Sequence, residues 1–216
     1  MKISYLETIG WDSALRGMRN PMNSHNLSDS ITDFDGDMKL DETSEHPKLI
    51  MNGNFVPVIG ENDLSLCKRL IKAGSSHRKF LRMISINCDI TASLKFFTEF
   101  DTYLFTVQNS TSQMHKMGSK LLTIEDFDAN TDPMSIFIVN KHIETWKENK
   151  SEENWLKMIM SVPQGFLYTR TVCFNYEVFI TQYFNRKNHK LYEWREYCET
   201  LKNDLPYMKE FLIESD

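Results

Sequence analysis

The clearest pattern in the chain is the alternation of apolar and polar residues over 84–91, ISINCDIT. A repeat of two is that of a β-strand, so this segment is predicted to be a strand with one buried face. A second, shorter strand is expected over 2–6. Residues 61–73 carry apolar side chains at helical spacing, and Gly74 follows where a helix-ending glycine is favoured.

The second half of the chain follows the helical repeat. Apolar residues recur at intervals of three and four within 136–146 and again within 191–201. Ser151 is expected to cap the helix that follows it. Further helices are predicted over 11–18, 93–101, 175–184 and 189–203, with a last turn starting at Pro206. These elements predict an α+β fold, a helix-rich single domain over 1–216 with a small central sheet.

Residues 20–60 interrupt this pattern. They lack apolar periodicity and are rich in Asn, Ser and Asp, so a long acidic surface loop inserted in the domain is predicted. Between 28 and 45 it holds seven carboxylates and one lysine. The stretch 33–37, DFDGD, is similar to a calcium loop but lacks the spacing and the bidentate Glu of an EF-hand, so no metal site is assigned.

Composition narrows the class of protein. The chain has 216 residues and a net charge of −5, which argues against a general DNA or RNA coat but permits a local basic pocket. No apolar run is long enough to span a membrane, and the first residues do not form a signal peptide. The four cysteines form no CxxC pair, as expected for reduced thiols. We therefore expect a cytoplasmic protein, in the host cytoplasm if a virus encodes it.

Two arginines and one polar run are the candidate binding groups. The guanidinium groups of Arg170 and Arg195 suit bidentate phosphate binding and keep their charge, although a solvated or ion-paired arginine is the common alternative. Residues 109–115, NSTSQMH, offer small donors that suit a ligand loop and equally suit a plain polar turn. The chain has no P-loop, GxGxxG or HExxH motif.

Read in order, several segments resemble the flavin-dependent thymidylate synthases. Residues 162–170, VPQGFLYTR, resemble the family's LP…LYTR segment, and residues 189–195, HKLYEWR, resemble its HAQWEIR segment. Residues 74–82 are similar to its histidine-containing helix, and 91–94 fall where a strand of the family runs into a helix. The resemblance extends over most of the chain.

The family's signature, RHRxxSxNExSxR, falls on residues 102–114, TYLFTVQNSTSQM. The Asn and the catalytic Ser are kept as Asn109 and Ser112, whereas Thr102-Tyr103-Leu104 replaces RHR. The resemblance implies a catalytic Ser112, a substrate site of Arg170, Arg195, Glu99 and Asn109, and a cofactor site of His77, Arg186 and His189. It also implies a homotetramer with sites shared between chains, in which aromatic residues at 96, 97, 100 and 105 would lie at interfaces.

The activity implied by the resemblance is one-carbon transfer to C5 of a pyrimidine deoxynucleoside monophosphate, dUMP or dCMP, with FAD and methylene-tetrahydrofolate. Glu99 stands where the family has Gln, and a carboxylate would favour the amino group of cytosine. Replacing RHR removes charge-assisted bonds to flavin phosphates worth roughly 1.5–3 kcal/mol each. Two alternatives stay open: a non-catalytic nucleotide-binding protein that has lost the flavin site, and an interaction protein whose acidic loop is the contact surface.

Overall fold

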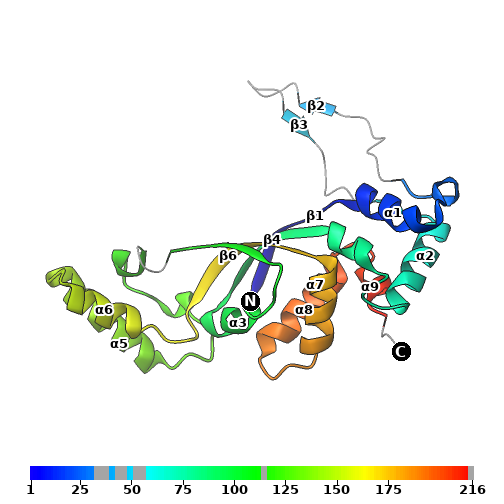
Figure 1. Cartoon of the computed structure of the whole chain (residues 1–216). Coiled ribbons are helices and arrows are strands. Elements are labelled where there is room, and N and C mark those ends of the chain that lie inside the picture. The colour runs from blue at the N-terminus through cyan, green and yellow to red at the C-terminus, as the bar shows by residue number, and fades with distance from the viewer. Residues whose placement is uncertain (32–38, 42–47, 51–56, 113–115, 214–216) are drawn as a thin grey trace.

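A small antiparallel sheet forms the centre of the molecule. The computed structural model describes residues 1–31, 39–41, 48–50, 57–112 and 116–213. Four strands pair in the order β1-β4-β6-β5, and β2 and β3 form a separate two-stranded sheet (Figure 1). The strands are β1 (Lys2–Ile9), β2 (Lys39–Asp41), β3 (Lys48–Ile50), β4 (Ser85–Ser93), β5 (Val107–Ser110) and β6 (Leu167–Asn175).

Strand β4 confirms the prediction made from its alternating pattern. It pairs with β1 on one side and with β6 on the other. Ile86, Cys88 and Ile90 are buried, whereas the polar residues between them are only partly covered. Because successive side chains of a strand point to opposite faces, β4 buries one face of the sheet and leaves the other partly open.

Helices supply the rest of the regular structure. They are α1 (Trp11–Arg19), α2 (Glu61–Lys72), α3 (Leu94–Phe100), α5 (Pro133–Glu148), α6 (Glu152–Met160), α7 (Tyr176–Arg186), α8 (Tyr192–Asp204) and α9 (Met208–Phe211). Helices α3, α7 and α8 lie on one side of the sheet (Figure 1). The α+β fold with a small central sheet is confirmed, and the helix predicted from residue 189 begins at Tyr192.

A glycine and several short polar residues set the helix boundaries. Gly74 has φ +97° just after α2, the left-handed conformation expected of a helix-ending glycine. The Ser151 side chain accepts a hydrogen bond from the Asn154 N–H, as predicted. Ser93 and Asn175 cap α3 and α7 in the same way, where β4 and β6 run directly into helices.

The aromatic residues of α3 lie in the core and not at an interface. Phe96, Phe97 and Phe100 are fully buried, and the Phe96 ring centroid is 4.5 Å from that of Trp194 on α8. The interface expected for these three residues is therefore wrong, because α3 is enclosed between the sheet and α8. Phe105, the fourth residue of that set, is 83% exposed.

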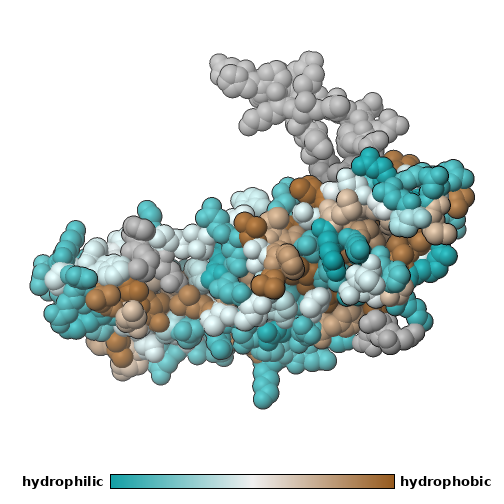
Figure 2. All heavy atoms as spheres, viewed as in Figure 1, coloured by the Kyte–Doolittle hydropathy of each residue, from teal (hydrophilic) through white to brown (hydrophobic). Residues whose placement is uncertain are grey.

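A second cluster of buried residues lies away from this core, around α5 and α6. It consists of Met117, Leu122, Phe127, Ile136, Val139, Ile143 and Met158. Figure 2 shows further hydrophobic surface at this end of the molecule. The chain thus buries two apolar clusters, and the single domain over 1–216 stays a prediction.

The segment predicted as an acidic loop insertion contains regular structure in its described parts, and the insertion over 20–60 stays a prediction. Residues Asn20–Met22 and His25–Leu27 form 3-10 turns, and Ile31 bridges to Val58. The carboxylate of Asp29 accepts from the Asn62 and Asp63 backbone N–H groups and so caps α2 from outside. The calcium-loop-like stretch 33–37 lies outside the described residues.

No helix in the described part of the chain is both long and apolar enough to cross a membrane. Likewise, the described residues bring together no group of three or more His, Cys, Asp or Glu side chains that could hold a metal ion.

Candidate functional site

Two residues of the sequence-predicted site, Arg186 and His189, meet on the carboxylate of a third, Glu99. Arg186 Nη1 at the end of α7 donates to Glu99 Oε2 on α3 at 2.8 Å. His189 Nε2 lies 3.2 Å from the same oxygen, and Trp194 Nε1 donates to it at 3.2 Å. The Leu191 N–H donates to His189 Nδ1, and His189 Nε2 also lies 3.0 Å from Arg186 Nη1.

This network limits what Glu99 can offer to a ligand. Its Oε2 already accepts from Arg186 and Trp194 and lies 3.2 Å from His189 Nε2. Its Oε1 lies 3.9 Å from Nζ of Lys95, and the Lys95 side chain is about half exposed. A base could therefore meet only Oε1, and a role of Glu99 in selecting cytosine stays a prediction.

Arg170 lies on β6, on the face covered by α3. Its guanidinium carbon is 4.2 Å from the centre of the Phe97 ring, and Nη1 pairs with Asp101 at 2.5 Å. Nη2 donates to the Tyr168 hydroxyl. The Nε of Arg170 is buried and has no hydrogen-bond partner among the described residues. A buried donor without a partner is rare, so an acceptor such as a ligand oxygen or a water molecule is expected there.

Asn109 lies on β5 and Ser112 just after it, and β5 pairs with β6. Asn109 lies opposite Thr171, and Ser110 lies opposite Arg170. Asn109 therefore shares the open face of the sheet with Thr171, whereas Arg170 points to the covered face. Ser112 follows β5 and lines a cleft of about 380 Å³.

This cleft combines hydroxyl groups, rings and lysines. Besides Ser112, its walls include Thr91, Thr111, Lys116, Lys120, Phe166, Tyr168 and Thr169. Lys120 is paired with Asp126 at 2.7 Å, and Lys116 is exposed. Burial raises the pKa of Tyr168 above its ordinary value, although the Arg170 hydrogen bond opposes the shift, so the phenol stays protonated at neutral pH. The cleft can thus cover a flat ring and hold an anionic group.

The other two predicted residues lie elsewhere on the chain. Arg195 is exposed on α8, where Nη1 donates to the carbonyls of His189 and Lys190 at 2.6 and 3.0 Å. His77 is exposed in the turn after α2. Arg195 and Arg170 have no hydrogen-bond partner in common among the described residues, so their convergence on one ligand stays a prediction.

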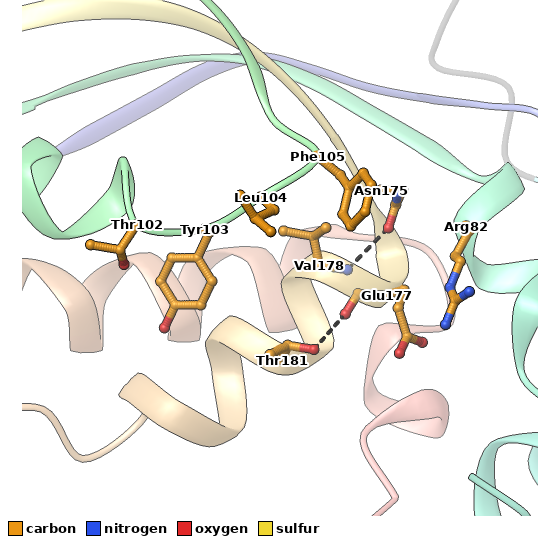
Figure 3. A pocket seen from close by; sticks show the side chains of 9 residues that line it. All are labelled: Arg82, Thr102, Tyr103, Leu104, Phe105, Asn175, Glu177, Val178 and Thr181. Carbon is orange, nitrogen blue, oxygen red and sulfur yellow. Dashed lines mark hydrogen bonds between the residues drawn. The ribbon is translucent and has the colours of Figure 1, made fainter. Parts of the chain in front are cut away.

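Residues 102–104, at the RHR position, line a second and larger cavity of about 700 Å³ (Figure 3). The cavity lies against α7, and its walls are Arg82, Thr102, Tyr103, Leu104, Phe105, Asn175, Glu177, Val178 and Thr181. The Tyr103 hydroxyl accepts from Arg186 Nε at 2.9 Å, which joins this cavity wall to the Glu99 network.

Comparison with known proteins identifies the fold. No protein-family model and no curated protein sequence matches the chain. Thymidylate synthase X (ThyX) from Helicobacter pylori, solved with FAD and dUMP, matches it with a TM-score of 0.72 at 16% identity, over 99% of this chain and 98% of that chain. Another structure of the flavin-dependent enzyme from the same organism, complexed with FAD and dUMP, matches with a TM-score of 0.71 at 17% identity, over 99% of this chain and 98% of that chain. The chain therefore has the fold of the flavin-dependent thymidylate synthases, and the resemblance found in the sequence is confirmed for the fold.

The residues at the RHR position do not fit FAD in the manner that the resemblance implies. Thr102, Tyr103 and Leu104 carry no positive charge, and Arg82 is the one cationic side chain that lines the adjoining cavity within the described residues. A pyrophosphate would need several charge-assisted bonds at this place. The residues at this motif position therefore provide no positive charge for the phosphates of a dinucleotide cofactor.

Sequence reasoning missed several residues that the structure brings to the two sites. Tyr168 and Gln108 adjoin Arg170, and Arg82 lines the cavity. Tyr168 and Arg82 lie within segments that carried the resemblance, so each had a signal. Gln108 lies at an unspecified position of the aligned signature, and only the pairing of β5 with β6 brings it to Arg170.

Proposed function

We propose that this chain binds a pyrimidine deoxynucleoside monophosphate in the cleft beside Ser112, as the acceptor of a one-carbon unit at C5. The observation that carries the proposal is the wall of this cleft, where the Thr111 and Ser112 hydroxyls and Lys116 lie beside the aromatic rings of Phe166 and Tyr168. Arg170, on the covered face of the sheet, donates through Nη2 to the Tyr168 hydroxyl. The ThyX structures that share the fold hold dUMP, which supports a pyrimidine nucleotide as the ligand.

The chemistry of the cleft suits such a nucleotide. The rings of Phe166 and Tyr168 provide apolar surface for a base. Lys116 and the hydroxyls of Thr111 and Ser112 provide a charge and donors for a phosphate. These groups bind and orient the nucleotide, and no step is assigned to a flavin because residues 102–104 provide no positive charge for the phosphates of FAD.

A second candidate is nucleotide binding without conversion. It is favoured by the absence of charge on residues 102–104, since a transfer to C5 needs a hydride source in addition to the nucleotide and the folate. An absorbance spectrum of the purified protein separates the candidates: a bound flavin band together with a methylated product supports transfer. A colourless protein that returns dUMP unchanged supports binding alone.

Isothermal calorimetry with dUMP and with dCMP tests the shared claim of nucleotide binding. We expect at least one of them to bind, and dCMP to bind more tightly if Glu99 Oε1 accepts from its amino group. Equal affinities, or tighter dUMP, would contradict the role of Glu99. Failure of both nucleotides would contradict the proposed function and favour an interaction protein.

Replacing Ser112 separates catalysis from binding. Ser112→Ala is expected to lower turnover strongly while changing the dissociation constant for the nucleotide less, if this hydroxyl faces the reacting edge of the base. Ser110→Ala is the matched control, because that serine is exposed on β5 and does not line the cleft. Equal turnover in the two variants would contradict a catalytic role of Ser112.

The shared sites implied by the resemblance predict a homotetramer. Arg195 and His77 would then serve the site of a neighbouring chain, which agrees with their exposed positions. Light scattering that shows a monomer would contradict shared sites.

A further inference from the structure

The charged side chains on the walls of the cleft beside Ser112 balance each other. They are two lysines and two carboxylates, namely Lys116, Lys120, Glu125 and Asp126. Because the formal charges of these walls sum to zero, the cleft as a whole attracts a phosphate only weakly, and individual cations must recognise it. The described residues on the walls offer the two lysines for this purpose. What each lysine can do depends on the partner it already has.

Lys120 has a partner that it can leave. Its Nζ donates to Asp126 Oδ1 at 2.7 Å, and the Lys120 side chain is 63% exposed. An ion pair at such an exposed position contributes little to stability, because water screens both charges. The ammonium group is a compact charge with three donors on a flexible stem. It can therefore turn to another oxygen while the backbone stays where it is.

Asp126 stays in place when Lys120 leaves. Its Oδ2 accepts from the Thr123 N–H at 2.8 Å and from the Thr123 hydroxyl at 3.2 Å, as part of the capping box of the 3-10 helix Ile124–Asp126. Burial alone would raise the pKa of Asp126, but the hydrogen bonds from Lys120 and Thr123 outweigh it and hold the pKa below the ordinary 3.8. The carboxylate is thus charged at neutral pH and fixed at the cleft wall, where it competes with a bound anion for Lys120.

We propose that Lys120 is a specificity-determining residue of this cleft, which exchanges Asp126 for the phosphate of a bound nucleotide. A phosphate monoester carries a charge of about −1.5 to −2 at neutral pH and offers three acceptor oxygens, so it can replace a single carboxylate. The exchange would make the cleft select a nucleotide over the nucleoside that lacks the phosphate. The inference rests on the proposed function, because it concerns the phosphate of the nucleotide proposed for this cleft.

Calorimetry of the full chain with dUMP and with deoxyuridine tests the exchange, because the two compounds differ only by the phosphate. The unchanged protein should bind dUMP at least about tenfold more tightly than deoxyuridine, the value of one charge-assisted hydrogen bond. In Lys120→Gln the affinity for dUMP should fall about tenfold, whereas that for deoxyuridine should stay the same. The exposed position of Lys120 predicts an intact fold, which the binding of deoxyuridine confirms in the same experiment.

Asp126→Asn tests the competition from the other side. The carboxamide keeps an oxygen that can accept from Thr123, but it no longer holds Lys120 by its charge. The affinity for dUMP should therefore rise roughly two- to fivefold, which corresponds to the loss of an exposed ion pair, and that for deoxyuridine should not change. A purely structural role of Asp126 predicts the opposite, a loss of affinity for both compounds.

Lys141→Gln is the matched control, since Lys141 pairs with Glu144 at 2.8 Å, is 60% exposed and does not line the cleft. It should leave both affinities unchanged. The inference is overturned if Lys120→Gln behaves like Lys141→Gln, if deoxyuridine weakens in step with dUMP, or if Asp126→Asn lowers the affinity for dUMP. In these cases dUMP still binds and the proposed function stands, whereas failure of both dUMP and dCMP to bind the unchanged protein overturns the two proposals together.

Discussion

Asp63→Ala is expected to lower the free energy of unfolding at neutral pH by about 3–5 kcal/mol, the usual effect of removing one partner of a buried ion pair. Asp63 is fully buried and Arg19 is 4% exposed, and Arg19 Nε donates to Asp63 Oδ1 at 2.6 Å. The Ser28 and Ser30 hydroxyls donate to the other carboxylate oxygen at 2.8 and 2.6 Å. The substitution would leave a buried guanidinium charge and detach residues 28–30 from α2.

The same variant has a pH signature. Burial alone would raise the pKa of Asp63, but the hydrogen bonds from Ser30, Ser28 and Arg19 outweigh it and hold the pKa below the ordinary 3.8. A carboxyl with a lower pKa in the folded state stabilises the fold above its unfolded pKa, and the contribution is lost as the pH falls through its folded pKa. The difference between the two proteins should therefore be complete near neutral pH and shrink below pH 3.8.

Urea unfolding from neutral to acidic pH measures both effects. Glu61→Ala is the matched control, because this carboxylate is exposed in the same first turn of α2. It should change stability by less than about 1 kcal/mol. A loss in Asp63→Ala no larger than in Glu61→Ala, or one that does not vary with pH, would contradict the buried pair as an anchor of this region.

Arg170→Ala is expected to weaken dUMP or dCMP binding about ten- to hundredfold, which corresponds to roughly 1.5–3 kcal/mol. The variant removes a guanidinium whose Nε has no partner within the described chain and which holds the Tyr168 hydroxyl at the cleft. The fold should survive, because the ion-pair partner Asp101 is about half exposed and can be solvated. Calorimetry measures the affinity, and urea unfolding measures the stability.

Arg16→Ala is the control for Arg170→Ala, since that arginine is exposed on α1 and forms only a long pair with Asp12. It should leave the dissociation constant unchanged. Arg195→Ala should weaken binding as Arg170→Ala does if the two guanidinium groups meet on one phosphate. If Arg170→Ala unfolds the protein while the folded fraction binds nucleotide normally, Arg170 is a structural ion-pair partner.

The sequence by itself determined the elements whose apolar pattern is local. The strict alternation over 84–91 is enough to define β4, and the 3.6-residue repeat with Ser151 and Gly74 defines α5, α6 and α2 to within a few residues. The resemblance carried by 162–170 and 189–195 was enough to indicate the fold. These signals are readable because each element must present one apolar face, whatever it packs against.

Only the tertiary structure decided which faces meet. Strand β6 was missed because Arg170 interrupts its buried face, and that position is tolerable only where the Phe97 ring and Asp101 receive the guanidinium. Glu99 and Arg186 are 87 residues apart, and nothing local shows that they pair. In the sequence, residues 102–105 show only that the RHR motif is replaced, whereas the structure shows that they line a cavity. Such contacts depend on the path of the whole chain, so no short window of sequence contains them.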